Sequence, residues 1–162
     1  MTTCAFAGHK EVYQGNVEHL LDDTIEKIIA SETAPFHFLV GGMGDFGAKA
    51  ASAVRRVKRN FPNIEIKLEL VLPYLTQELN RNKEYYELSY DEIIVPIELA
   101  DVHYKAAIPK CNRWMVDEST WLIAFVYRDF GGAYTTLKYA KKKGLNIINL
   151  ADCPKSKIRF GC

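Results

Sequence analysis

The sequence predicts a single α/β domain built on a largely parallel sheet. Short apolar runs alternate with amphipathic helical patterns along the chain, which is typical of that architecture. Its 162 residues, 48% hydrophobic and 25% charged, have the size and composition of one globular domain. No repeat, low-complexity stretch or linker divides the sequence. We therefore expect one domain over 1–162, with its core at about 3–150 and a peripheral tail at 151–162.

The first part of the chain is expected to alternate strands and helices. Apolar residues with helical spacing follow Asn16, a candidate N-cap, and a second helical pattern with small inward residues follows Asp45. Residues 64–72 alternate apolar and charged side chains, as in a strand with one wetter face. The expected elements are a strand over 3–7, a helix from residue 17, a strand over 36–40, a helix to about residue 60 with Ala48, Ala51, Val54 and Val57 inward, and a strand over 64–72.

The second part continues this pattern after a polar, tyrosine-rich stretch, 73–91, to which we assign no element. The most apolar run, 121–127, reads as a central strand, and Gly144 caps a helix that ends in three lysines. The expected elements are a short strand over 91–95, a helix over 110–119, the strand over 121–127, a helix over 133–143 and a last strand over 146–150.

Charge and composition exclude several classes of protein. With 21 Lys+Arg and 20 Asp+Glu the net charge is +1, so we do not expect nucleic acid as a partner. The basic run Arg55, Arg56, Lys58 and Arg59 reads as a solvated helix face. No membrane-spanning run and no signal peptide is visible, and the cysteines form no CxxC pair, so a cytoplasmic protein with reduced thiols is expected. His19, His37 and His103 have no metal-ligand spacing, so we expect no metal site and no cofactor.

Loops that contain glycine follow the expected strands over 3–7, 36–40 and 121–127, and we expect them to share one edge of the sheet. In an open parallel sheet, ligands bind beyond the carboxyl ends of the strands. Glycine lets the backbone approach a ligand, and helix N-termini attract anions, so this edge favours a phosphate or carboxylate. No GxGxxG and no P-loop motif is present. The expected ligand-binding residues are Gly8, His9, Lys10, Gly41, Gly42, Met43, Gly44, Asp45, Asn112, Arg113, Gly131, Gly132, Thr135 and Thr136.

Several side chains keep more than one interpretation. His9 is either a general base or a loop residue that bonds the backbone. Cys111, between Lys110 and Arg113, is either a thiol of lowered pKa or a plain half-buried one. Arg113 either pairs with a phosphate or forms an ion pair with Asp117 or Glu118. The tyrosines at 85, 86 and 90 stack on a base, cover the sheet edge or build an oligomer contact.

Three motifs, in order, resemble the YpsA-like branch of the SLOG superfamily. The run from Asn112 to Leu150 looks like the segment RN-x-x-MVD-x-S, an apolar strand, GG-x-x-x-T and YA-x-x-x-G of that branch. CAFAGHK resembles its first strand, and FLVGGMGDFGAKAASAVRRVK resembles its second glycine loop and helix. The resemblance covers about 3–150 and implies a Rossmann-like fold, with helices on both faces of the sheet, that binds nucleotides or nucleotide-derived molecules. Other members of the superfamily are DNA-processing proteins, and the Lonely-guy members cleave N-glycosidic bonds of nucleoside monophosphates.

Departures from the Lonely-guy motif PGG-x-GT-x-x-E bear on catalysis. Phe130, Tyr134 and Lys138 stand for its proline, third glycine and catalytic glutamate. Gly47 stands where the second loop usually carries an aspartate, and Cys111-Asn112 replaces RN. The resemblance therefore favours a binding protein, a sensor or sequestering protein for a nucleotide-like small molecule, over an enzyme. The alternatives are an N-glycosidase, with Asp45, Glu98 or His9 as catalytic candidates, and a nucleic-acid accessory protein using the basic run at 55–59.

We also expect a homodimer or a multiple of it. Tyrosines are enriched at interfaces, and small side chains such as Ala50 and Ala53 allow close helix contact. The competing interpretation places these alanines on a solvated helix face.

Overall fold

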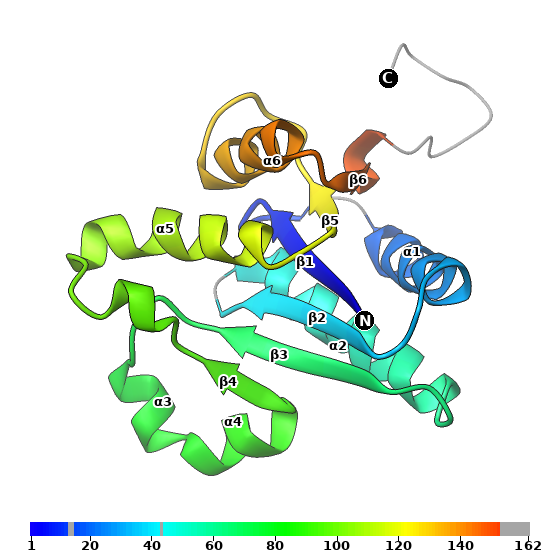
Figure 1. Ribbon diagram of the computed structural model, residues 1–162, viewed down its shortest axis with the longest axis horizontal. Helices are drawn as coiled ribbons and strands as arrows, with labels where there is room; N and C mark the ends of the chain where they lie inside the picture. The colour runs from blue at the N-terminus through cyan, green and yellow to red at the C-terminus, as the bar shows by residue number, and fades with distance from the viewer. Residues whose placement is uncertain (13–14, 43, 153–162) are drawn as a thin grey trace.

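One parallel sheet organises the chain. The computed structural model describes residues 1–12, 15–42 and 44–152, and within them six strands are ordered β4-β3-β2-β1-β5-β6, each pair parallel. This confirms the predicted single-domain α/β fold (Figure 1). The strands are β1 (Thr2–Gly8), β2 (Phe36–Gly41), β3 (Ile66–Val71), β4 (Glu92–Ile94), β5 (Trp121–Phe125) and β6 (Asn146–Asn149).

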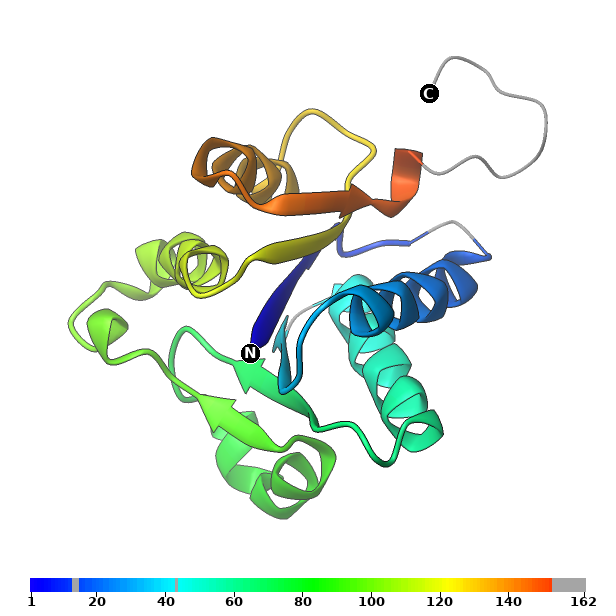
Figure 2. The same ribbon diagram turned by 45° about the vertical axis from the view of Figure 1, so that its right-hand side comes forward.

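Helices cover both faces of the sheet, as predicted (Figures 1 and 2). Alternate residues of each strand point to opposite faces, so the sheet separates two apolar clusters. The cluster beneath α1 (Val17–Ser31) and α2 (Gly44–Asn60) includes Phe38, and the cluster beneath α5 (Tyr104–Asp117) and α6 (Gly132–Lys143) includes Leu39. The remaining elements are the short helices α3 (Gln77–Arg81) and α4 (Lys83–Ser89) and the 3₁₀ turns Ile97–Leu99 and Leu150–Asp152.

Some boundaries differ from the predicted ones. Helix α5 begins at Tyr104, six positions before the predicted start, and carries Pro109 inside it. Helix α2 begins at Gly44 (φ +85°), so Asp45 lies in its first turn and is not its cap. Glycine at Gly44 permits the left-handed backbone that starts this helix. Asn16 precedes α1, but its side chain makes no capping hydrogen bond.

The small residues of α2 are buried inside the chain. Ala50 and Ala53 are fully buried in the cluster that α1 and α2 share, whereas Ala48, predicted inward, is exposed. Both interpretations of Ala50 and Ala53, as dimer contacts and as a solvated face, are therefore wrong. The homodimer itself stays a prediction, without support from these alanines.

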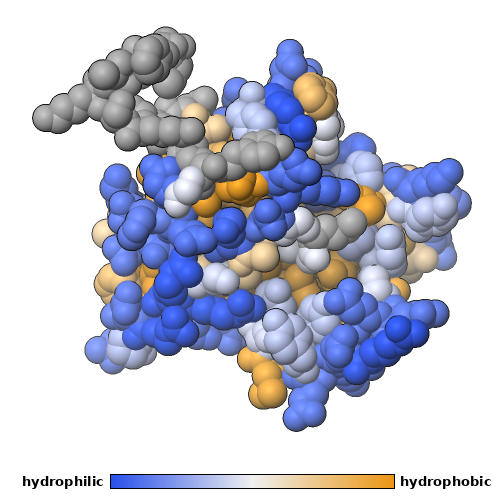
Figure 3. Space-filling view, turned by 180° about the vertical axis from the view of Figure 1, so that it is seen from behind, coloured by the Kyte–Doolittle hydropathy of each residue, from blue (hydrophilic) through white to orange (hydrophobic). Residues whose placement is uncertain are grey.

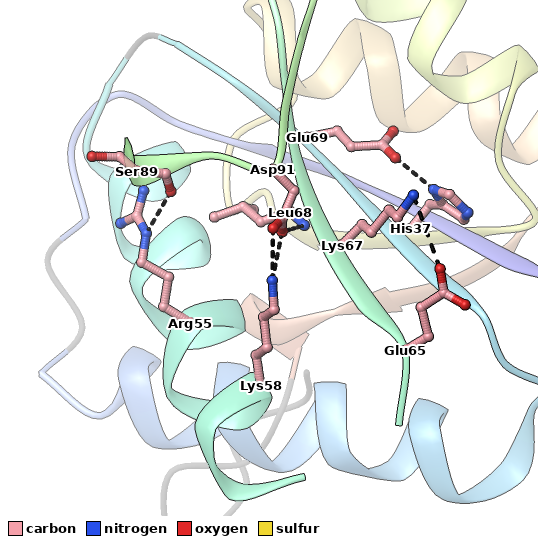
Figure 4. A network of polar contacts seen from close by, with 9 residues as sticks. All are labelled: His37, Arg55, Lys58, Glu65, Lys67, Leu68, Glu69, Ser89 and Asp91. Carbon is pink, nitrogen blue, oxygen red and sulfur yellow. Dashed lines mark hydrogen bonds and ion pairs between the residues drawn. The ribbon is translucent and has the colours of Figure 1, made fainter. Parts of the chain in front are cut away.

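Most of the basic run on α2 is tied to neighbouring elements (Figure 4). Arg55 donates to the carbonyl of Ser89 and lies over the ring of Tyr90, 5.0 Å from its centroid. Arg56 forms a two-fold contact with Asp22 on α1, and Lys58 bonds both carboxylate oxygens of Asp91 at 2.7 and 2.8 Å. These cations brace α2 against α1 and β4, which leaves Arg59 as the cation of the run without such a contact among the described residues.

On the face seen from behind, hydrophilic residues dominate, with hydrophobic residues scattered among them (Figure 3). Within the described residues, no helix is both long and apolar enough to cross a membrane.

We expect Gly8→Ala to lower the free energy of unfolding by about 1–3 kcal/mol, the usual cost of overpacking a core. A Cβ at Gly8 would overlap the Phe46 ring, which lies against the end of β1. Urea denaturation measures the change. Gly15→Ala is the matched control because a Cβ there meets no atom within 4 Å. Equal stabilities of the two variants would contradict this packing argument.

Candidate functional site

A cavity of about 480 Å³ opens where β1, β2 and β5 end, at the carboxyl edge of the sheet. The parallel sheet brings the three predicted loops to this place, although they are far apart in the sequence. Helix α5 supplies part of the wall through Asn112 and its neighbours, and residues of α2 and of the end of β3 supply further parts. The predicted residues that line the cavity are Gly8, His9, Lys10, Gly41, Gly42, Asn112, Gly131, Gly132 and Thr136.

A smaller cavity of about 280 Å³ adjoins the first, between α5 and α6. It shares Asn112, Gly132 and Thr136 with the larger cavity and adds two further predicted residues, Arg113 and Thr135. The two cavities therefore share part of their walls. The binding roles of these residues stay predictions.

Other predicted residues lie elsewhere. Gly44 and the exposed Asp45 start α2 without lining either cavity, and the exposed Glu98 lies on the 3₁₀ turn after β4. Met43 falls outside the described residues. Glu11 is the carboxylate that lines the larger cavity within 1–12, 15–42 and 44–152. The carboxylates named for the glycosidase alternative are thus not placed at the cavity, and no observation favours that activity.

His9 holds two of the loops together. Its ring is buried, and its Nε2 accepts hydrogen bonds from the backbone N–H groups of Tyr127 (3.1 Å) and Arg128 (3.3 Å). Its own backbone N–H donates to the carbonyl of Phe125 at 3.3 Å. Burial of the ring, and secondarily the nearby Arg128 cation, lower the pKa of His9 below its usual value. A neutral imidazole with Nε2 already accepting fits the loop-bonding interpretation of His9.

The next residue, Lys10, ties the same loop to α2. Its carbonyl accepts a hydrogen bond from the backbone N–H of Asp45 at 2.9 Å. The loop after β1 is therefore bonded on one side to the start of α2 and on the other to the loop after β5. Such cross-bonding fixes the mouth of the cavity with backbone contacts.

An aromatic and cationic cluster, Tyr127, Arg128 and Phe130, forms the rim beside His9. The guanidinium carbon of Arg128 lies 5.3 Å from the ring centroid of Tyr127 and 5.0 Å from that of Phe130. Both rings remain exposed, Tyr127 by 43% and Phe130 by 61%. Sequence reasoning missed this cluster as a site, although Tyr127-Arg128-Asp129-Phe130 stands directly before the glycine pair.

The start of α6 is open toward the cavity. Gly131 has φ +94°, which glycine adopts without strain, and no atom lies within 4 Å of a Cβ at Gly131 or Gly132. The hydroxyls of Thr135 and Thr136 donate to the carbonyls of Gly131 and Gly132, at 3.0 and 2.8 Å. An anion here would therefore meet the free backbone N–H groups of the first helical turn, not hydroxyl donors.

Cys111 lines the larger cavity with a buried thiol. Burial raises its pKa to about 11, which favours the plain thiol over one activated by Lys110 and Arg113. Desolvation by the fold outweighs the charges of its neighbours in sequence. Among the described residues no group of three His, Cys, Asp or Glu side chains is arranged to hold a metal ion.

Comparisons with known proteins indicate the fold to which the site belongs. No family model and no curated protein matches the chain. DNA processing protein A (DprA) from Streptococcus pneumoniae is similar in structure at 14% identity and a TM-score of 0.63, over 90% of this chain and 49% of that one. DNA processing protein A from Helicobacter pylori, studied for its single-stranded DNA binding mode, is similar at 12% identity and a TM-score of 0.60, over 90% and 63%. This chain thus spans less than two thirds of either protein's length.

The chain and these two neighbours share a Rossmann-like fold. Two functional predictions are corrected by these neighbours, one of which binds single-stranded DNA. The main prediction, a small nucleotide-like ligand, and the expectation of no nucleic-acid partner are both contradicted by these neighbours. The prediction of no nucleic-acid partner rested on the net charge of the whole chain. A net charge does not reveal cations gathered at one edge of the sheet, such as Lys10 and Arg128.

Proposed function

We propose that the chain binds single-stranded DNA along the carboxyl edge of its sheet. The observation that carries this proposal is the exposed cluster of Tyr127, Arg128 and Phe130 beside the open start of α6. Proteins bind single strands by stacking bases on aromatic side chains while cations and backbone N–H groups hold the phosphates. Both parts of such a site lie side by side here.

The charges around the cavity support the same conclusion. Lys10 and Arg128 line the larger cavity and Arg113 lines the smaller one, against the single carboxylate of Glu11 within the described residues. A phosphate backbone entering between them meets a local excess of positive charge, whatever the net charge of the chain. The basic run on α2 does not serve this purpose, because three of its cations are bonded to Asp22, Ser89 and Asp91 and the fourth, Arg59, lines neither cavity.

The branch of the superfamily and the location in the cell belong to the same proposal. We place the chain in the YpsA-like branch of the SLOG superfamily, on the three motifs given above, and in the cytoplasm. Single-stranded DNA would then be an intracellular ligand of this fold.

Titration of labelled single-stranded and duplex DNA, followed by fluorescence anisotropy, tests the proposal. We expect the single strand to bind more tightly than the duplex, with an affinity that falls as salt rises. Arg128→Ala should weaken binding about ten-fold, because it removes a cation–phosphate contact and hydrogen bonds to charged groups contribute about 1.5–3 kcal/mol. Arg59→Ala is the matched control, an exposed arginine at the far end of α2. Absence of binding at low salt, or equal losses in the two variants, would contradict the proposal.

A further inference from the structure

The smaller cavity differs in character from the larger one. Its walls are mainly apolar, from Ile108 and Pro109 on α5 and the Tyr139 ring on α6. Pro109 carries no N–H group, so this stretch of α5 offers no backbone donor there. At about 280 Å³ the cavity is near the lower limit of small-molecule pockets, a size for one ring system.

Two polar side chains at this cavity lack partners. Asn112, half-buried and shared by both cavities, and the exposed Arg113 make no hydrogen bond or ion pair within the part of the chain that the structure describes. The ion pair of Arg113 with Asp117 or Glu118, one of its two interpretations, does not form between these described residues. Asp117 instead accepts a hydrogen bond from the Tyr139 hydroxyl at 2.7 Å and pairs with Lys143 at 3.7 Å. The hydrogen-bonding capacity at the cavity is therefore left for a ligand.

We infer that this smaller cavity takes one guanine base of the bound strand, with Asn112 and Arg113 reading its edge. The inference rests on the proposed function, since it assigns a base position to the strand whose phosphates meet the start of α6. A flat ring with apolar faces suits the walls of Ile108, Pro109 and Tyr139, and only its edge needs polar partners. Single-stranded bases are read in this way, splayed out and bonded along their edges.

Guanine fits the two side chains better than the other bases. A guanidinium presents paired donors, which match the O6 and N7 acceptors of guanine. The corresponding edge of adenine carries a donor at N6, which cannot accept a hydrogen bond from a guanidinium. The Asn112 amide can accept from the N1–H and N2–H groups that guanine presents on its other edge.

Competition between matched strands tests this inference. The probes are a thymine tract and the same tract with one central guanine, adenine or cytosine. We expect the guanine strand to bind the wild-type chain about ten-fold more tightly than the thymine tract, since a good bidentate pair discriminates by about 1–3 kcal/mol. Asn112→Ala and Arg113→Ala should each reduce that ratio toward one, whereas Arg59→Ala should preserve it.

The outcomes separate this inference from the proposed function. If no strand binds, the proposed function fails. If all strands bind with equal affinity, single-strand binding holds and the guanine position is overturned. Asn112→Leu, of similar shape but without hydrogen-bonding groups, covers the case in which the alanine variant fails to fold. A preference that survives in both Asn112→Leu and Arg113→Ala would also overturn the inference.

Discussion

Gly132→Val is expected to weaken binding of single-stranded DNA by about 100-fold or more while the chain stays folded. Residue 132 is the first of α6, and a Cβ there meets no protein atom within 4 Å, so the fold has room for the new side chain. That room is the space in front of the open helix N-terminus. A branched side chain in it would keep a phosphate away from the backbone N–H groups.

Anisotropy titration gives the affinity, and circular dichroism confirms the fold. Gly15→Val is the matched control, since a Cβ at Gly15 also meets open space but Gly15 lines neither cavity. An unchanged affinity in Gly132→Val would remove the start of α6 from the site.

His9→Ala is expected to lower the free energy of unfolding by about 2 kcal/mol and to weaken DNA binding as well. The substitution removes the acceptor of the Tyr127 and Arg128 N–H groups, and an unsatisfied donor costs about 1–3 kcal/mol. Loss of these bonds would release the aromatic cluster that the proposed function uses. Urea denaturation and anisotropy measure the two effects, with His19→Ala, an exposed histidine on α1, as control.

The same contact predicts a pH dependence with a definite sign. Because the folded state lowers the pKa of His9, the unfolded state binds its proton more readily. The stability from this group is fully present above about pH 6.5 and is lost as pH falls through the lower, folded pKa. His9→Ala should lack this loss between neutral and mildly acidic pH. A wild-type chain whose stability rises on acidification over that range would contradict the assignment.

The sheet and the grouping of the glycine loops could be predicted because their causes are local. Apolar runs of strand length mark the strands, and parallel strands send their carboxyl ends to one edge. The start of α5 could not be placed, since Pro109 reads as a boundary although it lies inside the helix. The short helices α3 and α4 lack a strong apolar pattern and were left unassigned for that reason.

The chemistry of the site depended on contacts that sequence spacing does not reveal. The His9 ring accepts a hydrogen bond from the backbone N–H of Arg128, although the two residues lie 119 positions apart in the chain. Burial set the pKa of Cys111 in the direction opposite to that suggested by its charged neighbours. The basic run at 55–59 looked like a nucleic-acid surface or a solvated face, and became largely internal bracing only once α1 and β4 lay beside it.

The strand order has a consequence for how the ligand preference of this fold can change during evolution. From β1 the sheet extends outward through β2, β3 and β4, and the chain then returns to β5 on the other side of β1. The chain leaves β1 toward one face of the sheet and β5 toward the other. The two connections therefore diverge, and a crevice lies between them whatever side chains line it. Substitutions in the loops can therefore alter what is bound without abolishing the place of binding. The fold fixes where a ligand binds, and a few loop residues determine which ligand it is.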